Sequence, residues 1–104
     1  MATSNPMSMS IQQTSMPIFD GENYDFWRIK MKTLFISQKI WDLVENGYEE
    51  PNSSTTLTIA QKDQLKEYKK KDAKALFFIQ QAMSDKIFPR IIGASKAKEA
   101  WDIL

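Results

Sequence analysis

Apolar residues in this 104-residue chain recur at steps of three and four, the spacing that places them on one face of an α-helix. Nowhere do apolar and polar residues alternate for long, and valine, a strong strand former, occurs once, as Val44. The pattern predicts about five helices and no strand, with the helices in the ranges 24–38, 40–46, 58–83, 85–88 and 95–104. We therefore predict an all-α fold.

Residues with a capping role mark where these helices should begin and end. Thr58 and Gln61 match a capping box, in which each side chain satisfies a backbone N–H at the helix start. Asn23 is placed to cap the first helix through its side-chain oxygen, and Ser84 to cap the brief helix over 85–88. Gly47 supplies a C-terminal stop for the second helix.

The first sixteen residues differ from the rest of the chain. Residues 1–16 are rich in Ser, Thr and Met without periodicity, and we interpret them as a disordered leader before a domain over 17–104. The longest uninterrupted apolar run covers only residues 75–79, far too short to span a membrane. The absence of a targeting pattern favours the cytosol, with the nucleus as an alternative.

The composition excludes several kinds of chemistry. The chain contains no Cys and no His, so disulfides, thiolate or imidazole metal sites and histidine acid–base catalysis are excluded. Two carboxylate pairs, Glu49 with Glu50 and Asp20 with Glu22, lie in turn or loop composition without a reaction partner nearby, and we interpret them as solvated. The sequence predicts no enzymatic activity, no metal and no cofactor.

A basic cluster follows the predicted start of the long helix. It consists of Lys62, Lys66, Lys69, Lys70, Lys71 and Lys74. These lysines could contact RNA phosphates, or they could form a solvated helix face supported by pairs such as Glu67–Lys71. The solvated face is favoured, because no Arg fork or Gly-rich phosphate loop accompanies the lysines.

Aromatic residues crowd the first part of the chain. They are Phe19, Tyr24, Phe26, Trp27, Phe35 and Trp41. They could form a ligand slot or a base-stacking platform, but their helical spacing favours a role in the core. Phe26 and Ile36 lie off the apolar stripe, and we expect them to remain exposed for a partner.

Four segments resemble one known family. The run PIFDGENYDFWRIKM at 17–31 resembles the opening of Gag polyproteins of plant copia-type LTR retrotransposons, where the signature F-x-G-x-N-Y-x-x-W-x-x-x-M starts the capsid-like region. Three further landmarks follow in family order: Leu34 with residues 41–48, residues 72–76 leading to Ile79, and residues 98–104. The resemblance covers about residues 17–104.

This resemblance implies a small orthogonal bundle of helices like the N-terminal lobe of a Gag capsid domain. It also implies a non-enzymatic structural module that self-associates, with other copies or related Gag chains as partners and RNA bound weakly at most. An alternative is a nucleic-acid-binding adaptor that uses the lysine-rich helix 62–74. The residues that carry the family signature are Phe19, Gly21, Asn23, Tyr24, Trp27, Met31, Leu34, Trp41, Gly47, Ala75, Trp101 and Leu104.

The resemblance further implies that the family's region continues past residue 104. Trp101 should lock the last helix onto earlier ones, yet part of that helix would then lack its usual neighbour. We therefore expect an exposed apolar patch formed by Trp101, Ile103 and Leu104, and we expect it to favour self-association.

Overall fold

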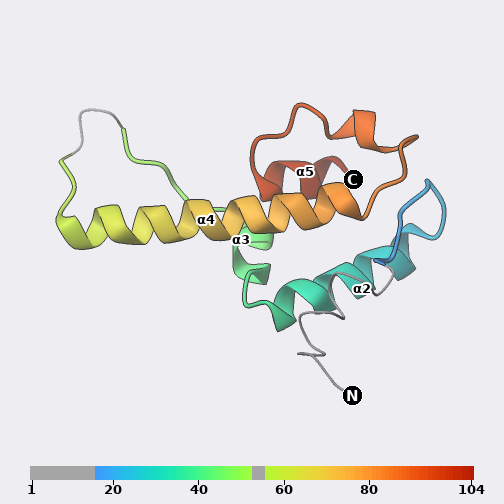
Figure 1. Ribbon diagram of the computed structural model, residues 1–104, viewed down its shortest axis with the longest axis horizontal. Helices are drawn as coiled ribbons and strands as arrows, with labels where there is room; N and C mark the ends of the chain where they lie inside the picture. The colour runs from blue at the N-terminus through green and yellow to red at the C-terminus, as the bar shows by residue number, and fades with distance from the viewer. Residues whose placement is uncertain (1–15, 53–55) are drawn as a thin grey trace, which may run out of the picture.

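The computed structural model describes residues 16–52 and 56–104 (Figure 1). This part of the chain forms four α-helices and one 3-10 helix: α2 (Tyr24–Ser37), α3 (Trp41–Asn46), α4 (Ile59–Gln81), η1 (Phe88–Arg90) and α5 (Ala97–Ile103). The described residues form no strand, and one isolated parallel bridge joins Phe19 to Met83. The all-α prediction is confirmed, while residues 1–15 of the predicted leader lie outside the described residues.

The helices pack around the C-terminal half of α4. α3 and α5 contact this helix and each other, and α2 contacts α3. The buried residues of α4 are Asp72, Ala75 and Ile79, all in its second half. The N-terminal turns of α4 extend beyond the other helices (Figure 1).

Trp101 lies at the centre of an aromatic cluster that joins three helices. Its ring centroid is 5.5 Å from that of Trp27 on α2 and 5.7 Å from those of Phe35 and Trp41. The Arg28 guanidinium lies 4.9 Å from the Trp101 ring centroid, and only 2% of Trp101 is exposed. Trp101 therefore locks α5 onto the earlier helices, and the prediction that it belongs to an exposed patch is wrong because its neighbours enclose it.

The residues of the family signature divide into three groups. Five are buried: Phe19, Trp27, Met31, Ala75 and Trp101. Five are half-buried: Tyr24, Leu34, Trp41, Gly47 and Leu104. Gly21 and Asn23 are exposed, and both have a positive φ, 104° and 56°, so they shape the backbone that enters α2 rather than the core.

The predicted N-terminal caps agree with the structure at one position and fail at two, and Gly47 ends α3 as predicted. Thr58 and Gln61 form the capping box at the start of α4. Asn23 is the N-cap residue of α2, but it adopts the left-handed conformation and its side chain makes no capping hydrogen bond. The hydroxyl of Ser84 is buried without a partner among the described residues, so it caps nothing.

The connection between α4 and α5 also differs from the prediction. The turn of helix expected over 85–88 is instead the 3-10 helix Phe88–Arg90, which has Pro89 in its first turn. Proline is tolerated there because the first N–H groups of a helix have no intrahelical acceptor. α5 begins at Ala97 rather than Ser95, because its N-cap residue Lys96 has an extended backbone conformation.

Gly47 should resist substitution. Its φ of 71° and ψ of −165° fall in a region that only glycine adopts readily, and an added Cβ would lie 3.1 Å from Lys98 Cδ. We expect Gly47→Ala to lower the free energy of unfolding by about 1–3 kcal/mol. Urea denaturation will measure this change, and Gly93→Ala, where a Cβ meets no atom within 4 Å, is the matched control. Equal effects of the two substitutions would contradict the argument.

Candidate functional site

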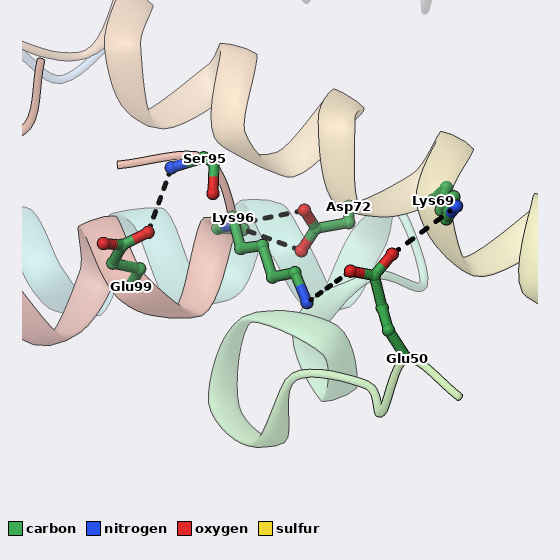
Figure 2. Close-up of polar contacts among 7 residues, drawn as sticks. Glu50, Lys69, Asp72, Ser95, Lys96 and Glu99 are labelled. Carbon is green, nitrogen blue, oxygen red and sulfur yellow. Dashed lines mark hydrogen bonds and ion pairs between the residues drawn. The ribbon is translucent and has the colours of Figure 1, made fainter. Parts of the chain in front are cut away.

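A polar junction formed by Glu50, Lys69, Asp72 and Lys96 ties three segments of the chain together (Figure 2). Asp72 projects from α4, and its two carboxylate oxygens accept the backbone N–H of Ala97 at 3.2 and 3.4 Å. Lys96, the N-cap residue of α5, makes no capping hydrogen bond with its own side chain. Asp72, a residue of α4, thus caps α5. The side chain of Asp72 is buried, since only 4% of the residue is exposed.

Glu50 completes the junction from the loop after α3. Its carboxylate lies 3.5 Å from the ammonium of Lys69 and 3.4 Å from that of Lys96, one oxygen toward each. The Lys96 ammonium also lies 4.6 Å from the ring centroid of Tyr48. Figure 2 shows the side chain of Lys96 passing below Asp72 to reach Glu50, so one lysine links the loop to the start of α5.

The pKa values of the two carboxyl groups in the junction are shifted in opposite directions. Burial raises the pKa of Asp72, and the N–H of Ala97 and the charge of Lys96 oppose that rise only in part. Lys96, with a smaller contribution from Lys69, lowers the pKa of Glu50. Each carboxylate is held by contacts between elements of the fold, so the junction positions α5.

The sequence did not assign this role to Asp72, although a signal was present. Asp72 occupies the helical register of the apolar stripe that runs through Leu65, Leu76 and Ile79. A carboxylate at a core-facing position needs a buried hydrogen-bond donor. Its position therefore indicates a tertiary contact, although it does not identify Ala97 as the donor.

The six lysines predicted as a nucleic-acid site are all exposed on α4. Lys69 is engaged by Glu50, and the Lys74 ammonium lies 5.9 Å from the ring centroid of Phe78. The other four, Lys62, Lys66, Lys70 and Lys71, form no ion pair within residues 16–52 and 56–104. The Glu67–Lys71 pair expected from the sequence is therefore not formed in that part of the chain, and RNA contact stays a prediction.

The aromatic residues form a core rather than a slot. Phe19, Trp27 and Phe35 are buried, and the half-buried Tyr24 packs edge-on against Phe19 with centroids 5.5 Å apart. Phe26 is 68% exposed, as predicted. The favoured core interpretation is therefore confirmed for Phe19, Trp27 and Phe35, whereas the ring of Phe26 lies outside the core.

Both carboxylate pairs, Asp20 with Glu22 and Glu49 with Glu50, lie in turns or loops, as predicted from the sequence. Asp20 accepts the backbone N–H of Glu22 at 3.1 Å, in a turn before α2. Glu49 and Glu50 border an open hollow of about 260 Å³ above Leu65 and Tyr68. Among the described residues, no group of three or more carboxylates is placed to hold a metal ion.

The end of α5 and the outer side of α2 are two of the surfaces with exposed apolar side chains. Ile103, near the end of α5, is 48% exposed, and Leu104 beside it is half-buried. On α2, Phe26, Ile29 and Ile36 are 68%, 64% and 53% exposed. No helix in the described part of the chain is long and apolar enough to cross a membrane.

Comparison with known proteins assigns the chain to a family. The sequence model of the family described as gag-polypeptide of LTR copia-type matches residues 31–104. The landmarks at 41–48, 72–76 and 98–104 lie within the match, whereas most of the run at 17–31 precedes it. No curated protein and no solved structure gives a significant match. Gag is a structural, non-catalytic region of the retrotransposon polyprotein, and this chain belongs to the gag-polypeptide family of copia-type LTR retrotransposons.

Proposed function

We propose that this domain is a non-enzymatic assembly module that associates with further copies of itself or with related Gag chains in the cytosol. The observation that carries the proposal is the contrast between a closed aromatic core and exposed apolar side chains. Trp101 is 2% exposed, whereas Phe26 and Ile29 are more than half exposed. Removing such side chains from water on contact with a second chain contributes about 25 cal/mol per Å² of apolar surface.

The polar contacts support a structural role rather than a reaction. Asp72 caps α5, and Glu50 bridges two lysines. Membership in a family of structural polypeptides agrees with this use of the charged groups.

Sedimentation velocity over a wide range of protein concentration tests the proposal. We expect the sedimentation coefficient to rise with concentration as the chain self-associates. A folded chain that sediments as a monomer at every concentration, with circular dichroism showing intact helices, would contradict the proposal.

The lysine face of α4 supports a second candidate function, binding of nucleic acid. Lys62, Lys66 and Lys70 are spaced one turn apart, are exposed, and have no ion-pair partner in the described residues. Phosphate contacts from such lysines would be electrostatic, independent of sequence and sensitive to salt.

Charge reversal distinguishes this candidate from non-specific attraction. The double substitution Lys66→Glu with Lys70→Glu should abolish the binding of single-stranded RNA, measured by fluorescence anisotropy at low salt. Lys86→Glu with Arg90→Glu makes the same change in net charge at two other exposed residues and is the matched control. Equal losses of affinity in both variants would contradict a role for the lysine face.

A further inference from the structure

Phe77 is an aromatic residue of α4 whose ring remains accessible to solvent. It is 54% exposed, whereas its neighbour Phe78 is half-buried and packs against the core. The centroids of the two rings lie 6.5 Å apart. Phe78 therefore joins this part of α4 to the core, and the ring of Phe77 is free to contact a molecule outside the chain.

The residues around Phe77 on the helix surface are small or polar. Side chains three and four positions apart are neighbours on a helix, and for Phe77 these are Ala73, Lys74, Gln80 and Gln81. The ring is therefore an isolated aromatic surface rather than part of an apolar stripe that a second helix would cover. A single ring can stack on one nucleobase, and such stacking tolerates any base because every base has a π-face.

Lysines continue the face on which Phe77 lies. At about 100° per residue, Lys66, Lys70 and Phe77 lie within about 40° of one another around α4, and Lys74 lies within about 60° of Phe77. From Lys66 to Phe77 the helix rises by about 16 Å, which equals the length of about five stacked nucleotides of one strand. This face can therefore contact several phosphates and one base of the same strand.

The exposed charges on this part of α4 favour a polyanion. Those between positions 68 and 81 are all positive, since Asp72 is buried: Lys69, Lys70, Lys71 and Lys74. Glu50 pairs with Lys69 and leaves the other three without an ion-pair partner in the described part of the chain. The exposed carboxylates of α4, Asp63 and Glu67, lie earlier in the helix. Just after the helix the exposed charged residues are Asp85, Lys86 and Arg90.

We infer that the face of α4 formed by Lys66, Lys70, Lys74 and Phe77 binds single-stranded RNA, with Phe77 stacking on a base and the lysines contacting phosphates. This inference rests on the second candidate function and adds to it the residue that distinguishes a single strand from a duplex. In a duplex the bases are paired and stacked on one another, so the ring of Phe77 has no base to contact. The lysines contact the phosphates of either form.

Phe77→Ala tests the stacking by fluorescence anisotropy at low salt. The probes are a labelled single-stranded RNA of about ten nucleotides and a duplex of the same sequence. The substitution should weaken binding of the single strand at least about fivefold and change binding of the duplex by less than about twofold. Phe77→Trp keeps a ring and should bind the single strand at least as tightly as the Phe77→Ala variant binds the duplex.

Phe26→Ala is the matched control, because it removes a phenylalanine that is 68% exposed on α2. It should leave both affinities within about twofold of the wild type. Phe77 is more than half exposed, so its substitution should leave the helices intact, which circular dichroism will verify. Equal losses of affinity in the Phe77→Ala and Phe26→Ala variants would overturn the inference.

The dependence of binding on salt separates the ring from the lysines. In a plot of the logarithm of affinity against that of salt concentration, each lost phosphate contact makes the slope less steep by about 0.7 for a single strand. Lys70→Ala should show this change, and Lys30→Ala, at an exposed lysine of α2, should not. Phe77→Ala should keep the wild-type slope, since it removes no phosphate contact. A slope flattened in Phe77→Ala as much as in Lys70→Ala would contradict stacking.

The outcomes distinguish this inference from the candidate function on which it rests. A wild-type chain that binds neither RNA contradicts both. Binding that is lost in Lys66→Glu with Lys70→Glu but kept in Phe77→Ala contradicts the role of Phe77 alone. Weaker self-association of Phe77→Ala in sedimentation velocity, with unchanged affinity for RNA, would assign the ring to a protein interface and overturn the inference.

Discussion

Replacing Trp101 by alanine is expected to lower the free energy of unfolding by about 3–5 kcal/mol. Trp101 is 2% exposed and contacts the rings of Trp27, Phe35 and Trp41, so its loss opens a cavity where three helices meet. Small domains have a total stability of about 5–15 kcal/mol, and a chain this short lies at the low end. Much of the variant should therefore be unfolded at 25 °C.

Urea denaturation followed by circular dichroism at low protein concentration will measure the effect. Ile103→Ala, on the same helix at a position 48% exposed, is the control and should change the free energy of unfolding by less than about 1 kcal/mol. Trp101→Phe keeps a ring in the cluster and should lose less than the alanine variant. A loss below about 1 kcal/mol in Trp101→Ala would show that the aromatic cluster does not hold α5 in place.

Removing the cap that Asp72 provides should have the second-largest effect. Asp72→Ala leaves the N–H of Ala97 buried without an acceptor and should cost about 2 kcal/mol. Asp72→Asn keeps an oxygen that can accept this N–H, and it should retain most of the stability at neutral pH. Urea denaturation of both variants separates the contribution of the hydrogen bond to stability from that of the charge. Equal losses of free energy of unfolding in the two variants would contradict a capping role.

The stability of the domain should also depend on the protonation of Asp72. Because burial raises the pKa of Asp72 above its usual 3.8 in the folded chain, the folded state binds this proton more tightly than the unfolded state. This contribution to stability is fully present below pH 3.8 and is lost as the pH rises through the folded pKa.

Comparison with Asp72→Asn isolates that contribution, since the other carboxyl groups are common to both chains. The wild-type free energy of unfolding, minus that of the variant, should fall as the pH rises from about 3 and then become level. Urea denaturation at several pH values will measure the difference. A difference that rises with pH would contradict the direction of the shift.

The helices could be predicted from the sequence because their signals are local. The stripe through Trp27, Met31 and Phe35 indicated α2, and the capping box of Thr58 and Gln61 indicated the start of α4. The exposure of Phe26 and Ile36 also followed from helical spacing, since both lie off the core stripe. The family landmarks at 41–48 and 98–104 lie within the part of the chain that the family model matches.

The features that could not be predicted depend on contacts between distant residues. Asp72 caps Ala97 from 25 positions earlier in the chain, and no local pattern identifies that partner. Serine is a common N-cap residue. The hydroxyl of Ser84, however, is buried, and its backbone carbonyl accepts the N–H groups of Ile87 and Phe88. The burial of Trp101 depends on the rings of Trp27, Phe35 and Trp41, which lie far from it in the sequence, so the pattern of the last helix alone does not predict it.

The N-terminal turns of α4, which extend beyond the other helices, should be the first part of the domain to open. The buried residues of this helix lie at or after Asp72, so its first turns depend on the capping box and on the loop through Glu50 for their stability. Short helical segments with little tertiary packing fray at low cost in free energy. Backbone amides before about Lys69 should therefore exchange with deuterium faster than those near Ile79, and trypsin should cut the lysine-bearing turns while the aromatic cluster is still closed.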